Sequence, residues 1–158
     1  MNIADWCIRN NIAVKALTKQ TWWVGGKWIP EPDKFSIGFT LTGHDELETG
    51  CNTNAERIDA MRYLHNRYTL FASIEPIIDI RSSIKMISAS APYCSLYKIG
   101  LQSGVKYRVR NLRYFIQAVF SMVHPSAKVY FKDSLLQQAG IERNSLPECC
   151  VGRDYKLI

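Results

Sequence analysis

The sequence has little that points to a membrane, a secretion route or a metal centre. No apolar run approaches the roughly 20 residues that a membrane-spanning helix needs. An acid at Asp5 and the lack of an apolar core argue against a signal peptide at the N-terminus. The five cysteines are odd in number and irregularly spaced, which argues against a disulfide framework. No C-x-x-C pair, P-loop, G-x-G-x-x-G turn or metalloprotease histidine pair is present. We therefore expect a cytoplasmic protein with no metal site of its own, and the motifs identify no catalytic residue.

Composition indicates one compact domain. The chain has 158 residues, of which 47% are hydrophobic and 22% charged, an ordinary globular balance. Twenty basic residues against fourteen acidic ones give a net charge of +6, which suits nucleic acid, a phosphorylated ligand or an acidic partner. Basic residues gather at Lys106–Arg110 and Arg113, so Arg108, Arg110 and Arg113 are candidates for contact with phosphate or nucleic acid. Alternatively, these basic residues form the solvent-exposed start of a helix or face of a loop and bind no ligand.

Apolar periodicity predicts an alternation of strands and helices along the chain. Thr53 and Glu56 form a capping box at the start of a helix that runs to about residue 64. A broad apolar stripe predicts another helix over 112–123, stopped by His124-Pro125. Helices are also expected at 3–10, 82–89 and 134–139, and strands at 12–18, 35–41, 69–78, 96–102 and 128–132. The connection 20–34 has no regular pattern.

This alternation favours parallel pairing through right-handed crossovers. In the strands at 35–41 and 96–102 one face is apolar and the other small or polar, whereas a parallel sheet covered on both faces should be apolar on both. The sequence therefore predicts an α/β fold: a partial (β/α) barrel of about five parallel strands with outer helices and a polar interior, over residues 1–139. Residues 140–158 form a tail with no strong pattern. Alternatively, the polar face meets solvent at an incomplete sheet.

Ligands of such barrels bind at the carboxyl ends of the strands. Glu75 is the sharpest candidate, because it lies in an apolar run and an unpaired buried carboxylate is costly. An ion pair with Lys19 or Lys132 would be a purely structural explanation. His44 lies in a loop after a strand, which is a plausible place for a site residue; the alternative is an ordinary exposed loop histidine. We expect Thr40, Thr42, Ser73, Glu75 and Gln102 to bind a cofactor, and Lys19, His44 and Lys132 to bind a substrate.

Five segments match, in order, motifs of one enzyme superfamily. Residues 11–19 look like a V-x-x-L-T-K strand, 36–46 like V-x-x-S-x-T-T-x-D-x-E, and 55–65 like the helix that follows. Residues 71–78 resemble an S-I-E-P-I strand, and 129–133 a V-F-(F/V)-K strand. Together, over roughly residues 3–136, they resemble radical SAM proteins related to spore photoproduct lyase and to phage-encoded relatives.

The resemblance implies a partial barrel that binds S-adenosylmethionine at its strand ends, with Thr40, Ser73 and Glu75 helping to hold cofactor or substrate. Family members bind a [4Fe–4S] cluster through a C-x-x-x-C-x-x-C loop after the first barrel strand, and this chain has no such motif. The chain thus looks like the C-terminal part of such a barrel, inactive alone, with the cluster supplied by an N-terminal part.

Two other interpretations stay open. The domain can be a binding module without chemistry, holding a nucleotide-like ligand or nucleic acid. It can also be a structural protein that associates with itself through an exposed sheet edge.

Overall fold

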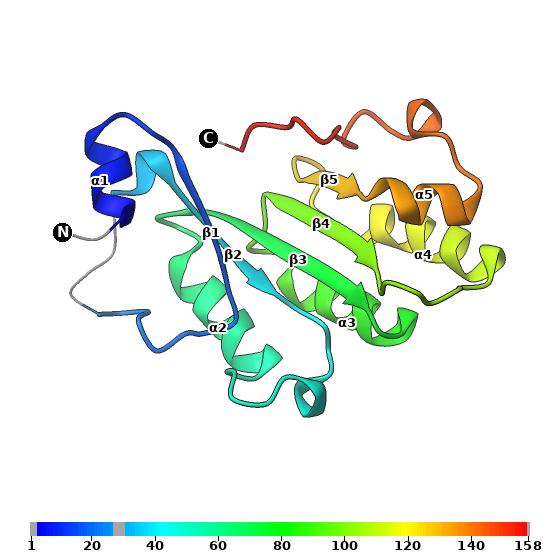
Figure 1. Cartoon of the computed structure of the whole chain (residues 1–158), viewed down its shortest axis with the longest axis horizontal. Helices are drawn as coiled ribbons and strands as arrows, with labels where there is room; N and C mark the ends of the chain where they lie inside the picture. Colours follow the sequence, from blue (N-terminus) through cyan, green and yellow to red (C-terminus); the bar gives the residue numbers. More distant parts are fainter. Residues whose placement is uncertain (1–2, 27–30, 158) are drawn as a thin grey trace.

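The fold is a single sheet of five parallel strands with helices on one face. The computed structural model describes residues 3–26 and 31–157. The strands lie side by side in chain order, β1-β2-β3-β4-β5, and every neighbouring pair is parallel (Figure 1). The predicted α/β class with five parallel strands is confirmed. The strands are β1 (Val14–Thr18), β2 (Phe35–Thr40), β3 (Thr69–Ile77), β4 (Leu96–Leu101) and β5 (Lys128–Phe131).

The strand order determines on which face of the sheet the connecting helices lie. A right-handed crossover between adjacent parallel strands puts its helix on the same face each time, so α2, α3 and α4 form one layer. The apolar stripe of α4 packs on the sheet through Leu112, Phe115 and Val119, all fully buried. In the described residues the helices are α1 (Ile3–Arg9), α2 (Asn54–Leu64), α3 (Ile80–Ser90), α4 (Val109–Met122) and α5 (Asp133–Ala139). None is long and apolar enough to cross a membrane.

Local signals set several helix ends. The predicted capping box is present: the backbone N–H of Glu56 donates to the Thr53 hydroxyl, and the Thr53 N–H donates to the Glu56 carboxylate. Asp79 caps α3 by accepting from the backbone N–H of Ser82 at 2.9 Å, which places the helix start at Ile80 rather than at residue 82. Gly140 ends α5 in the left-handed region, with φ of 62°.

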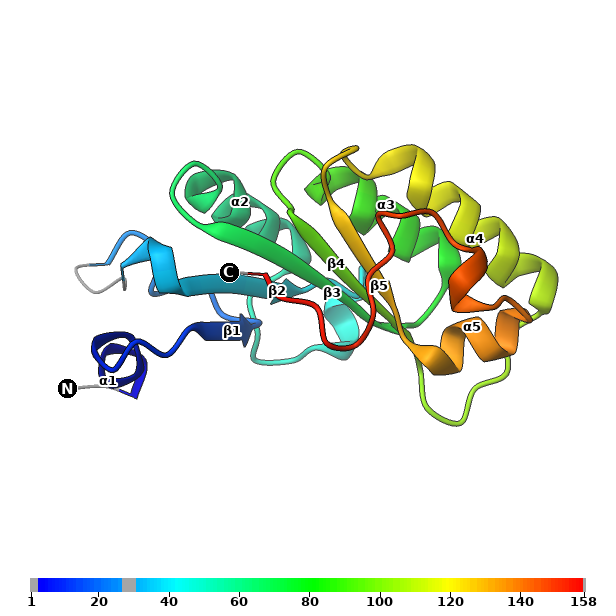
Figure 2. The ribbon, with the colours of Figure 1, turned by 90° about the horizontal axis from the view of Figure 1, so that it is seen from above.

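The C-terminal segment crosses the face of the sheet opposite α2–α4, which we call the inner face (Figure 1, Figure 2). It first runs beside β5, where the Val129 N–H donates to the Cys149 carbonyl and the Val151 N–H to the Val129 carbonyl. Val151, Tyr155 and Leu157 then pack on a cluster of three buried residues of the inner face: Phe71, Leu96 and Tyr130. The position of this segment, whose sequence has no periodic pattern, is therefore set by tertiary packing.

Tyr155 reaches from this segment to the far strand. Its ring lies 5.8 Å from that of Tyr130 on β5, and the Lys15 ammonium on β1 lies 4.4 Å from its centre. Burial, and then the neighbouring charge of Lys98, lower the pKa of Lys15. The C-terminal segment therefore spans the inner face from β5 to β1 near the amino ends of the strands.

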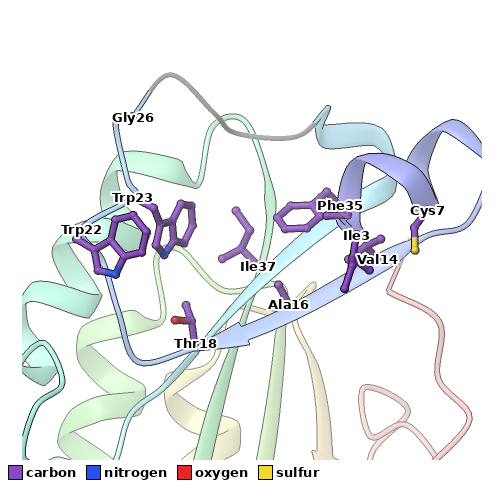
Figure 3. Close-up of a pocket in the computed structure, with 11 residues that line it drawn as sticks. Ile3, Cys7, Val14, Ala16, Thr18, Trp22, Trp23, Gly26, Phe35 and Ile37 are labelled. Carbon is purple, nitrogen blue, oxygen red and sulfur yellow. The ribbon is translucent and has the colours of Figure 1, made fainter. Parts of the chain in front are cut away.

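The β1–β2 connection has no α-helix among its described residues. The helix-side face of these two strands is therefore open as an apolar groove of about 830 Å³ (Figure 3). Val14 and Ala16 of β1 form its floor with Ile37 of β2, and Trp23 borders it, stacked on Phe39 with ring centres 6.4 Å apart. Both α1 and the outer edge of β1 lie beside the groove.

Candidate functional site

The register of the sheet puts polar side chains in one row across the inner face. Thr40 on β2 is in register with Ser73 on β3, Ser73 with Lys98 on β4, and Lys98 with Tyr130 on β5. Residues paired in a parallel sheet point to the same face, so these four side chains are neighbours. Thr40 and Ser73 are buried, and Lys98 is half-buried. Thr40, Ser73 and Lys98 lie nearer the carboxyl ends of their strands than Phe71 and Leu96 do.

Phe71 covers Gly38 on the inner face, beneath the C-terminal segment. Its ring lies over Gly38 so closely that a Cβ on Gly38 would be 2.1 Å from the nearest ring carbon. Gly38 is in register with Phe71, and Leu96 follows on β4. The apolar floor thus depends on the absence of a side chain at Gly38.

Glu75 and Lys132 form an ion pair at the carboxyl end of the inner face. Their side chains are 27% and 42% exposed, so the pair borders solvent. Gly100 lies beneath them, because a Cβ there would be 2.9 Å from Cδ of each. Of the two partners considered for Glu75, the structure selects Lys132. The pair can pack this closely over β4 only because residue 100 has no side chain.

Lys19 instead pairs with Glu48, a carboxylate that the sequence reasoning did not single out. Glu48 is buried, with Lys19 Nζ at 2.7 Å from Oε1 and Arg57 Nη1 at 2.7 Å from Oε2. The Thr42 hydroxyl donates to Oε2 at 3.0 Å, and Arg57 Nη1 also donates to the Thr40 carbonyl at 2.8 Å. Burial alone would raise the pKa of Glu48, but Lys19, then Arg57, hold it below its usual value.

Arg57 comes from the buried side of α2 and is fully buried. Its Nε and Nη2 have no hydrogen-bond partner among the described residues. A buried guanidinium with spare donors is stable only while its carboxylate partner is present. The Glu48–Arg57 pair therefore fixes the 42–48 loop against the end of β2.

His44 joins that loop to α3. Its Nε2 lies 2.6 Å from Asp79 Oδ2, and its Nδ1 lies 2.7 Å from Glu46 Oε1. Only a protonated imidazole donates from both nitrogens. The bonds to Glu46, then to Asp79, raise the pKa of His44. Burial opposes the shift at Asp79, but bonds from Ser82 and His44 lower its pKa to about 2.

The structure divides the predicted site residues into two groups. Glu75 and Lys132 meet, and Thr40 and Ser73 stand in the polar row beside them. Thr42 and His44 belong to the 42–48 loop, where Thr42 donates to Glu48 and His44 pairs with Asp79 at the start of α3. Lys19, directly after β1, pairs with Glu48 of the same loop. Gln102 is exposed, and its backbone carbonyl accepts from the N–H of Val105 in a turn. In the part of the chain that the structure describes, no hydrogen bond joins its side chain to either group.

For other residues of the site, the sequence did not indicate their contact partners. Lys98 and Gly100 were visible as the polar face of a predicted strand, but their proximity to Glu75 depends on register. Glu48 and Arg57 lie nine residues apart in a loop and a helix, and no spacing rule pairs them. Asp79 is readable as a cap for a following helix, but its bond to His44 across 35 residues is not.

The three arginines predicted to contact phosphate differ in their hydrogen bonds and exposure. Arg113 is fixed, because its Nε donates to the Ala139 carbonyl at 2.9 Å and its Nη2 to the Gly140 carbonyl at 3.2 Å. Arg108 and Arg110 are exposed at the start of α4. A shallow hollow of about 470 Å³ lies beside Arg110 and Arg113.

The described residues do not fit an iron–sulfur cluster. Over residues 3–26 and 31–157 no three His, Cys, Asp or Glu side chains are grouped so that they could hold a metal ion. Cys7 lies in α1, Cys51 in the loop before α2 and Cys94 before β4, so these thiols come from separate elements.

No family model, curated protein or solved structure matches this chain. The resemblance to radical SAM proteins consequently stays a hypothesis, and the site itself carries the functional argument.

Proposed function

We propose that the chain binds S-adenosylmethionine, or a close analogue with an amino-acid group, as the C-terminal part of a radical SAM-like barrel. The observation that carries this proposal is the Glu75–Lys132 pair above Gly100. An amino-acid group has an ammonium and a carboxylate. A half-exposed carboxylate–ammonium pair can exchange its internal contact for both of these charges at small cost.

Neighbouring features support the same ligand. The Lys98 ammonium and the Thr40 and Ser73 hydroxyls stand in the next row of the inner face, where they offer further hydrogen bonds. The site lies at the carboxyl ends of parallel strands, where ligands of this architecture bind. Bound S-adenosylmethionine supplies a sulfonium whose reductive cleavage gives a radical. This chain's residues bind and orient the ligand.

Reductive cleavage needs a cluster-bearing N-terminal part of the barrel, on the same or another chain. Two features of β1 are consistent with such a part. Among the described residues no strand pairs with the outer edge of β1, and the apolar groove lies beside it. Backbone groups at an open edge favour pairing with an added strand.

Titration calorimetry with S-adenosylmethionine tests the binding step without catalysis. We expect Glu75→Gln to weaken binding about tenfold or more, since a hydrogen bond to a charged group contributes roughly 1.5–3 kcal/mol. Gly100→Val should abolish binding, because its side chain would displace those of Glu75 and Lys132. The control Glu142→Gln removes the same charge from an exposed position after α5 and should leave affinity unchanged. Equal affinities for all four proteins, or no binding by the unaltered chain, would refute the proposal.

A further inference from the structure

Charge is strongly segregated along this chain. Residues 80–132 contain nine Lys and Arg and no Asp or Glu, whereas the remaining residues contain eleven basic and fourteen acidic ones. The net charge of +6 therefore arises entirely from α3 to β5. Seven of the nine basic side chains are exposed: Arg81, Lys85, Lys106, Arg108, Arg110, Arg113 and Lys128.

Within this stretch, the start of α4 has the densest group of cations. Lys106, Arg108 and Arg110 lie within five residues, and none has a carboxylate within ion-pair distance among the described residues. Exposed cations with no partner retain their full attraction for a polyanion. We call Lys106, Arg108, Arg110, Arg113 and Tyr114 the α4 patch.

The α4 patch is held rigidly. The Tyr107 backbone N–H, beside Lys106, donates to the Gln138 side chain of α5, and Arg113 donates to the Ala139 and Gly140 carbonyls. The backbone at both ends of the patch is therefore fixed to α5, so that little backbone entropy is lost when a ligand binds.

An aromatic ring stands among the cations. Tyr114 is 62% exposed although it belongs to an amphipathic helix whose apolar side is buried. It lines the shallow hollow with Arg110 and Arg113. An exposed flat ring beside cations lets a base stack while phosphates contact the cations, the combination typical of single-strand binding.

We propose that the α4 patch binds single-stranded nucleic acid, with Tyr114 stacking on a base and Lys106, Arg108 and Arg110 contacting phosphates. The patch lies on the outer helix layer, whereas the Glu75–Lys132 site lies at the inner face. The two proposals therefore rest on different residues and fail independently.

Fluorescence anisotropy with a labelled 20-nucleotide single strand, from 50 to 200 mM salt, tests the patch. Lys106→Gln/Arg110→Gln should weaken binding and reduce the salt slope by about 1.4, since each lost phosphate contact on a single strand contributes about 0.7. The control Arg9→Gln/Arg153→Gln removes the same charge from exposed positions elsewhere and should leave the slope unchanged.

Tyr114→Ala should weaken binding about fivefold or more, the loss of one base–aromatic stack. The control Tyr63→Ala removes an exposed tyrosine, 68% accessible, from α2 and should have no effect. Any one of three results would overturn the proposal. The first is no binding at 50 mM salt, and the second is an equal loss of affinity in the patch and control variants. The third is equally tight, patch-dependent binding of polyglutamate or anionic vesicles.

Discussion

Replacing Gly38 with alanine should severely disturb the floor of the inner face. The added Cβ would lie 2.1, 2.2 and 2.5 Å from three carbons of the Phe71 ring. Non-bonded carbons are most stable at about 3.5–4.0 Å, so the ring must move by more than about 1 Å. Phe71 is only 2% exposed and packs against Leu96 and the C-terminal segment, which leaves it little room.

We expect Gly38→Ala to lower the free energy of unfolding by about 3 kcal/mol, the upper end of the usual cost of overpacking. In a chain of this size that corresponds to a fall in Tm of roughly 6–12 °C. Urea unfolding followed by tryptophan fluorescence measures the change. Gly152→Ala is the control, because the nearest atom there is the end of the Asp154 side chain at 3.0 Å, which can turn away.

The double variant Gly38→Ala/Phe71→Ala separates a steric cause from a backbone effect at Gly38. Phe71→Ala alone should cost about 3–5 kcal/mol. Once the ring is absent, the alanine at position 38 has nothing to overlap, so the double variant should be no less stable than Phe71→Ala. Additive losses in the double variant would refute the steric explanation.

The remaining predictions concern the buried pair, the histidine and the C-terminal segment. Arg57→Met should cost about 3–5 kcal/mol in urea unfolding, because Glu48 then remains buried with fewer partners; an unchanged midpoint would contradict this. His44→Gln should remove a stabilising contribution that is full below pH of about 6.5 and is lost as pH rises through the raised pKa of His44. The contribution of Asp79 is present above about pH 4 and is lost as pH falls towards its pKa of about 2. Unfolding of both proteins between pH 2 and 9 tests both statements, and a pH-independent difference would argue against a charged His44. Tyr155→Ala removes a ring contact and a cation–π contact, so the C-terminal segment should be cleaved faster in limited proteolysis and stability should fall by about 1–2 kcal/mol. Unaltered cleavage would show that Tyr155 does not hold the segment.

Much of the fold is readable from local pattern. The capping box at Thr53 and the stripe of α4 predict their helices because both signals involve residues within a few turns of each other. The five strands were each placed to within about two residues at either end. The alternation of small and large residues in β2 correctly indicated two different faces, although the C-terminal segment that covers part of the inner face has no such pattern.

For the candidate site, the sequence indicated which charged residues lie at the strand ends, and the tertiary structure decided which of them form ion pairs. The sequence alone predicted that Glu75, Lys132 and Lys19 lie at or near the carboxyl ends of parallel strands, and hence at one edge of the sheet. Only the folded chain decided that Glu75 pairs with Lys132 while Lys19 pairs with Glu48. Strand register, the missing side chain at Gly100 and the path of the 42–48 loop set which charges meet. These depend on packing between residues far apart in the chain, whereas sequence periodicity reports only on near neighbours.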